Sequence, residues 1–106
     1  MKAPVVGNLY VSNVTHKSFS VSWNGTESGF EGFILEVIDT SWLKEPVELN
    51  VSHNTMSYDI KGLEPSTDYI AYLYGVMKGR RTHAISTVAT TGISSSFIYS
   101  IMSYDI

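Results

Sequence analysis

The side chains of this sequence that could carry chemistry are its histidines, its serines and one short basic segment. His16, His53 and His83 fall on separate predicted elements, the chain has no cysteine, and no HxH or HExxH spacing occurs. A zinc site needs ligands that converge at about 2 Å from the ion. The serines alternate with apolar residues, and neither a G-x-S-x-G motif nor a phosphate-loop glycine pattern is present. We therefore predict no catalytic residues, no metal site and no cofactor, and hence no enzyme.

The densest positive charge lies between Met77 and Thr82, where Lys78, Arg80 and Arg81 surround one glycine. Three cations on a tight turn could bind a protein partner or, weakly, a sulfated glycan. The alternative is a solvated hairpin turn, which the net charge of −3 for the whole chain favours. The same acidic balance argues against a nucleic-acid partner.

Three N-x-[ST] sequons, which begin at Asn13, Asn24 and Asn50, are candidate glycosylation sites. Each falls at a predicted strand edge or in a loop, where a glycan has the exposure that it requires. Three sequons in so short a chain favour a secreted, extracellular origin over chance occurrence.

Length and composition predict one globular domain. At 106 residues, with 43% hydrophobic and 16% charged residues, the chain can bury a core without help from a metal or a disulfide. The lack of cysteine leaves the redox compartment open. Met1 to Pro4 has no apolar signal-peptide region, and no apolar stretch is long enough to cross a bilayer. We therefore expect no membrane span, and expect that a secreted protein is represented here by an excised or recombinant module.

Seven short runs of alternating or β-branched residues predict strands at residues 8–14, 18–23, 33–38, 46–51, 54–60, 69–76 and 82–90. In the second run Phe19, Val21 and Trp23 share one face, and serines take the other. Pro46 suits the start of an edge strand, where a missing donor is tolerated. No convincing helical period occurs. The fold class predicted is all-β, a seven-stranded antiparallel β-sandwich.

The segment from Leu63 to Tyr69 has the form of a sandwich corner between two predicted strands. In sandwiches of immunoglobulin type, a tyrosine near the start of the sixth strand hydrogen-bonds to backbone a few residues upstream and pins this corner. The spacing of Leu63, Pro65 and Tyr69 predicts the same arrangement here.

With Trp23, Leu63 and Tyr69 as core landmarks, the sequence from residue 3 to residue 91 resembles the fibronectin type III family, an immunoglobulin-like fold. Residues 11–15, 18–23, 74–81 and 84–91 are similar more specifically to tenascin repeats. The resemblance implies a non-enzymatic cell-adhesion module of the extracellular matrix, which presents loops and sheet faces to extracellular protein partners. It assigns residues 1–91 to the domain and leaves residues 92–106 as a C-terminal extension.

Ala71 departs from the family pattern, in which a larger branched residue takes that inward position. By volume, it predicts a void unless Met56 or another flexible side chain fills the space. On this interpretation the substitution Ala71→Val is neutral or stabilising.

Ile70, Tyr72 and Tyr74 are predicted to project from the sixth strand away from the core. If the third strand is its neighbour, as the family arrangement implies, Ile34 and Ile38 lie on the same outer face. A contiguous aromatic and aliphatic sheet face is a candidate partner-binding surface. The alternative is that these are ordinary exposed apolar groups whose cross-strand pairs stabilise the sheet.

The extension contains Met102–Ile106, which repeats Met56–Ile60 letter for letter. Residues 97–106 are apolar, nearly uncharged and free of proline, which is the composition of an aggregation-prone strand. The extension is either disordered, or added as a strand to a sheet edge of its own or another molecule, or exchanged with the internal copy in a second molecule. Because exchange must displace an anchored strand, edge addition is favoured over it. The residues expected to carry self-association are Phe97, Tyr99, Met102, Tyr104 and Ile106.

The repeat also supports an alternative function. An engineered fibronectin type III scaffold, used as a binder or as a self-associating protein through its C-terminal strand, would account for a copied segment.

Overall fold

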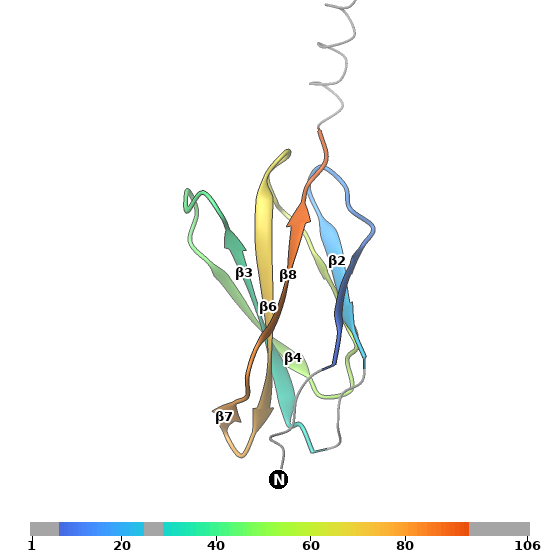
Figure 1. Cartoon of the computed structure of the whole chain (residues 1–106), viewed down its shortest axis with the longest axis vertical. Coiled ribbons are helices and arrows are strands. Elements are labelled where there is room, and N and C mark those ends of the chain that lie inside the picture. Colours follow the sequence, from blue (N-terminus) through green and yellow to red (C-terminus); the bar gives the residue numbers. More distant parts are fainter. Residues whose placement is uncertain (1–6, 25–28, 94–106) are drawn as a thin grey trace, which may run out of the picture.

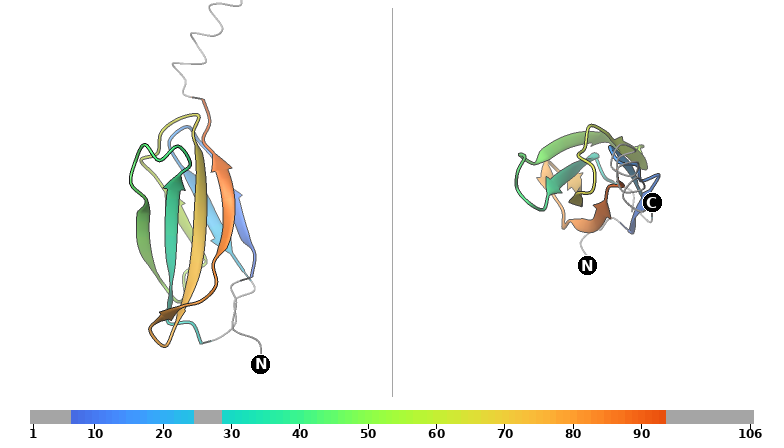
Figure 2. Two further views of the ribbon diagram at one scale, coloured as in Figure 1. Left: turned by 60° about the vertical axis from the view of Figure 1, so that its left-hand side comes forward. Right: turned by 90° about the horizontal axis from the view of Figure 1, so that it is seen from above.

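The computed structural model describes residues 7–24 and 29–93, which form two antiparallel β-sheets packed face to face (Figures 1 and 2). The first sheet has the strand order β1 (Leu9–Ser12), β2 (Phe19–Trp23) and β5 (Ser57–Ile60). The second has the order β4 (Val47–Ser52), β3 (Gly32–Asp39), β6 (Asp68–Met77) and β7 (Arg80–Arg81), with β8 (Ile85–Thr90) also paired to β6. The predicted all-β antiparallel sandwich is confirmed.

The core lies between the two sheets and follows the period of two along the strands. Inward residues of β3 alternate strictly with half-buried outward ones, and β6 shows the same pattern through most of its length. Complete burial of one large apolar side chain contributes about 1.5–3 kcal/mol, so this layer is the main source of stability. Its members are Phe19, Val21, Trp23, Phe33, Leu35, Val37, Val51, Ile60, Tyr69, Ala71, Leu73 and Ala89.

The last predicted strand, residues 82–90, begins only at Ile85 in the structure, and Arg80–Arg81, which were predicted as part of a turn, form the short strand β7. Lys78 and Gly79 adopt positive φ angles of 52° and 74° and turn the chain, and β7 follows as a two-residue strand. The Thr82 hydroxyl then accepts the Gly75 N–H at 3.0 Å, while the Thr82 N–H donates to the Gly75 carbonyl at 2.8 Å. In a regular ladder a backbone carbonyl would accept the Gly75 N–H, but here the Thr82 hydroxyl accepts it. Regular pairing with β6 is therefore interrupted and resumes at Ile85.

The corner from Leu63 to Tyr69 is held by one hydrogen bond within itself and by hydrogen bonds to two other segments. The Glu64 N–H donates to the Tyr69 hydroxyl oxygen at 2.9 Å, and Tyr69 is itself buried in the core. The Leu63 N–H donates to the Lys17 carbonyl at 2.8 Å, and the Ser66 N–H donates to the Gly92 carbonyl at 2.9 Å. These bonds tie the corner to the β1–β2 connection and to the chain that follows β8.

Thr91 is a second part of this corner, which the sequence did not indicate. Its side chain is 3% exposed, and its hydroxyl donates to the Glu64 carbonyl at 2.6 Å while accepting the Thr67 N–H at 2.9 Å. One buried hydroxyl therefore joins the chain after β8 to two backbone groups of the turn before β6.

Ala71 is fully buried, with Val37 of β3 and Thr87 of β8 as its cross-strand neighbours. The expectation that Met56 could fill the space beside it does not hold, because Met56 precedes β5 and is 41% exposed. We therefore expect Ala71→Val to leave the melting temperature unchanged or to raise it, since each added buried carbon contributes up to about 0.8 kcal/mol. A clear fall in melting temperature, measured by calorimetry, would show that the space is already full.

Candidate functional site: the outer face of the five-stranded sheet

The outer face of the five-stranded sheet, directed away from the other sheet, gathers side chains from all five strands. The register places Ile34 opposite Tyr74, Ile38 opposite Ile70, and Ile70 opposite Val88. All five residues predicted for this surface lie on it, and each is half-buried by its neighbours. Its side chains include Ile34, Glu36 and Ile38 of β3, Glu48 and Asn50 of β4, Ile70, Tyr72, Tyr74 and Val76 of β6, Arg81 of β7, and Ser86 and Val88 of β8.

Three aliphatic side chains lie side by side across the neighbouring strands β3, β6 and β8. We call this set, Ile38, Ile70 and Val88, the apolar row. Val88 is 61% exposed, although valine is a residue type that is most often buried. The sequence did not single out Val88, because the pattern of residues 82–90 does not show which side of that strand faces outward. An aliphatic row on a sheet face, half-buried at Ile38 and Ile70 and exposed at Val88, is a candidate protein-binding surface.

Arg81 belongs to the outer face rather than to the turn. Its guanidinium lies 5.0 Å from the centroid of the Tyr74 ring, and one of its nitrogens lies 2.9 Å from Glu48 Oε1. The hydrogen bond that Arg81 donates to the Glu48 carboxylate is the main reason why the pKa of Arg81 is raised. The arginine therefore reaches across the sheet and caps one end of the aromatic surface with charge.

The three cations of the basic segment do not form one cluster. Arg81 is engaged by Glu48, which leaves Lys78 and Arg80 exposed at the turn. The Gly79 N–H donates to Glu31 Oε1 at 3.1 Å, so a carboxylate also lies against this turn. This arrangement weakens the positive potential on which binding of a sulfated glycan would depend.

The connection between β3 and β4 is a second exposed apolar feature, which the sequence did not single out. Trp42 is 66% exposed and Leu43 is 85% exposed, and Trp42 has a positive φ of 58°, a conformation that L-residues other than glycine adopt rarely. Asp39 holds the loop: its Oδ1 accepts the Ser41 hydroxyl at 2.7 Å and the Ser41 N–H at 2.9 Å. These bonds, the side-chain one first, lower the pKa of Asp39. The ion pair between Lys44 and Glu64 ties the loop to the corner.

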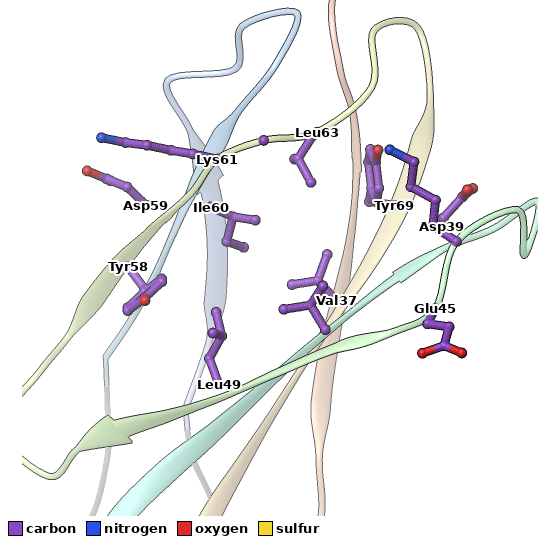
Figure 3. Close-up of a pocket in the computed structure, with 13 residues that line it drawn as sticks. Val37, Asp39, Glu45, Leu49, Tyr58, Asp59, Ile60, Lys61, Leu63 and Tyr69 are labelled. Carbon is purple, nitrogen blue, oxygen red and sulfur yellow. The ribbon is translucent and has the colours of Figure 1, made fainter.

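A pocket of about 400 Å³ opens between the edges of the two sheets, beside β4 and β5 (Figure 3). Val37, Leu49, Ile60 and Leu63 point toward one another across it, whereas Lys61 points away (Figure 3). The walls are therefore apolar and the mouth is charged.

His16, His53 and His83 lie outside the strands of the described chain. No group of three His, Asp or Glu side chains there is placed to hold a metal ion. Within residues 7–24 and 29–93 there is also no helix with the length and hydropathy needed to cross a membrane.

The three sequon asparagines are all exposed. Asn50 lies on the outer face, directly opposite Ile34, and Asn24 donates to the Tyr10 hydroxyl at 3.4 Å. Thr26 of the second sequon, and the predicted association residues Phe97, Tyr99, Met102, Tyr104 and Ile106, lie outside the described residues.

The two packed antiparallel sheets and the tyrosine-pinned corner define an immunoglobulin-like sandwich domain. Residues 3–91 match the family model of the fibronectin type III domain, and the chain belongs to that family, which is non-catalytic. Its sequence is similar to tenascin of Gallus gallus, with 51% identity over 88 residues, and to tenascin of Mus musculus, with 47% identity over 90 residues. These matches cover 83% and 85% of this chain, but the chain spans only 5% and 4% of the two relatives.

Solved structures agree on the fold. A fibronectin type III domain of human collagen XX aligns with a TM-score of 0.78 at 20% identity, covering 84% of this chain and 92% of that one. A two-domain fibronectin type III segment of chicken tenascin aligns with a TM-score of 0.74 at 20% identity, covering 81% of this chain and 48% of that one. The relatives in sequence, tenascins and a collagen XII chain, are extracellular-matrix proteins.

Proposed function

We propose that this chain is a secreted adhesion module of the extracellular matrix, which binds an extracellular protein through the outer face of its five-stranded sheet. The observation that carries the proposal is the apolar row of Ile38, Ile70 and Val88, with Val88 61% exposed. The similarity to tenascins supports an adhesive role but does not select a surface.

The outer face has the composition of an interface centre with a charged boundary. Protein interfaces have an apolar and aromatic centre surrounded by a polar rim, with arginine and tyrosine enriched. Here the apolar row and Tyr72 form the centre, and the Arg81–Glu48 pair lies toward one side. Because β6 is hydrogen-bonded on both sides, its side chains are already fixed, and little ordering is required when a partner binds.

Weak binding of a sulfated glycan at Lys78 and Arg80 is the alternative site of partner contact. The Glu31 carboxylate at the turn and the pairing of Arg81 both count against it. The two sites respond differently to a competing polyanion, so one experiment separates them.

Glycans at Asn13, Asn24 and Asn50 are part of the proposal for a secreted protein, since all three side chains are exposed. We expect mass spectrometry of protein secreted from a eukaryotic host to show glycan at one or more of these asparagines. Unmodified mass at all three would leave the sequons as chance matches.

Cell attachment tests the proposed function. Wells coated with the protein are expected to retain fibroblasts above albumin-coated wells, and soluble folded protein in excess is expected to compete for attachment. Heparin should leave attachment unchanged if the outer face carries it. Attachment no greater than on albumin would contradict an adhesive role, and loss of attachment with heparin would assign binding to the basic turn instead.

A further inference from the structure

The first sheet has a free edge at β5, and that edge forms one side of the apolar pocket. In the described chain β5 pairs only with β2, and its Tyr58 and Ile60 line the pocket together with Leu49 of β4. An unpaired strand edge presents backbone donors and acceptors that can take a further strand. The pocket next to it offers space for the inward side chains of such a strand.

The existing partner of β5 shows which sequence pattern suits this strand. β2 places Phe19 opposite Ile60, Ser20 opposite Asp59, and Val21 opposite Tyr58. Within that register the Ser20 hydroxyl donates to Asp59 Oδ1 at 2.6 Å. The face of β5 is therefore complemented by an apolar–serine–apolar sequence running antiparallel to it.

Met102-Ser103-Tyr104 repeats this pattern in the C-terminal extension. An antiparallel register with Met102 opposite Ile60 places Ser103 opposite Asp59 and Tyr104 opposite Tyr58. Alternation then directs Met102, Tyr104 and Ile106 to the same side as the pocket-lining residues of β5.

The exit point of the chain permits this pairing within one molecule. Gly92 accepts the Ser66 N–H, so Ile93 lies at the corner end of the sandwich, where β5 also finishes (Figure 1). A segment that returns from this end runs antiparallel to β5. The eight residues between Ile93 and Met102 reach about 30 Å when extended, whereas the four residues of β5 span about 13 Å.

We infer that Met102–Ile106 adds to the free edge of β5 in its own molecule and places Tyr104 in the pocket between β4 and β5. The segment that fills the pocket is therefore the C-terminal repeat, and it pairs with β5, the strand whose sequence it repeats. This association does not involve the outer face and is independent of the proposed adhesive function.

A pair of lysine substitutions in the full-length protein tests the inference. Tyr104→Lys puts a charge into the apolar pocket, whereas Ser103→Lys places the same charge on the opposite side, facing Asp59. Amide hydrogen exchange by NMR is expected to show the amides of residues 57–61 exchanging about tenfold more slowly in the wild type and in Ser103→Lys than in Tyr104→Lys. Both substitutions lie outside the core, so all three proteins should fold, and Tyr104→Lys should melt somewhat below the other two because it loses the docked strand.

Analytical ultracentrifugation of the same samples gives their molecular mass, which shows whether the added strand comes from the same molecule or from a second copy. A monomer with protected β5 amides supports the inference. A dimer with protected β5 amides would overturn it in favour of addition from a second copy, and equal exchange rates in all three proteins would overturn docking at β5.

Discussion

The Thr91→Val variant is expected to unfold at a markedly lower temperature than the wild-type protein. Valine preserves the shape of the buried side chain but removes the hydroxyl that bonds the Glu64 carbonyl and the Thr67 N–H. A buried polar group left without a partner costs about 1–3 kcal/mol, so two such groups should together cost about 2–6 kcal/mol. In a domain of this size each kcal/mol lowers the melting temperature by about 4–8 °C.

Thr90→Val is the matched control, since it makes the same chemical change one residue earlier. The Thr90 hydroxyl also makes a hydrogen bond, to Asp68 Oδ1, but the residue is exposed and water can replace that bond. Its effect should be within about 0.5 kcal/mol. Similar losses in both variants, by thermal and urea unfolding, would show that Thr91 has no special role in the corner.

The Gly75→Ala variant is the second substitution for which we expect a large loss of stability. A Cβ at Gly75 would lie 2.2 Å from Cε1 and 2.6 Å from Cδ1 of the Phe30 ring, and 3.0 Å from the Thr82 hydroxyl. Phe30 packs against the core and lies 5.4 Å, between ring centroids, from Phe33, so it has little space in which to move. Overpacking of this kind costs about 1–3 kcal/mol.

The clash predicts strong coupling between positions 75 and 30. In a Phe30→Ala background the ring is absent, and Gly75→Ala should cost far less or even stabilise the strand. A double-mutant cycle by urea denaturation measures this coupling. Additive effects of the two substitutions would contradict the contact as the source of the loss.

The layers of the fold could be predicted from the sequence because they depend on local patterns. Strict alternation in β2 fixes which side chains face inward, and the spacing from Leu63 to Tyr69 predicts a pinned corner. The outer-face residues of β3 and β6 could be grouped for the same reason, once the two strands were taken as neighbours.

Other features depend on contacts between distant segments and left no local pattern. In the sequence, Thr91 is one more threonine at the end of a β-branched run. Its structural role depends on hydrogen bonds to the turn before β6, which is distant in the sequence. The sequence places Arg81 in a basic turn. In the structure its side chain contacts Glu48 and the Tyr74 ring and lies over the outer face of the sheet. The exposed Trp42 loop depends on the Asp39–Ser41 bonds and on the ion pair of Lys44 with Glu64.

Two glutamate substitutions on opposite sheets give the most direct test of the account. Val88→Glu places a charge in the apolar row, whereas Tyr10→Glu places it at a residue of β1 that is 47% exposed. At equal coating density, and with unchanged melting temperatures, Val88→Glu is expected to reduce fibroblast attachment at least severalfold while Tyr10→Glu retains it. Full attachment to Val88→Glu, or equal loss in both variants, would contradict the claim that the outer face of the five-stranded sheet binds the partner.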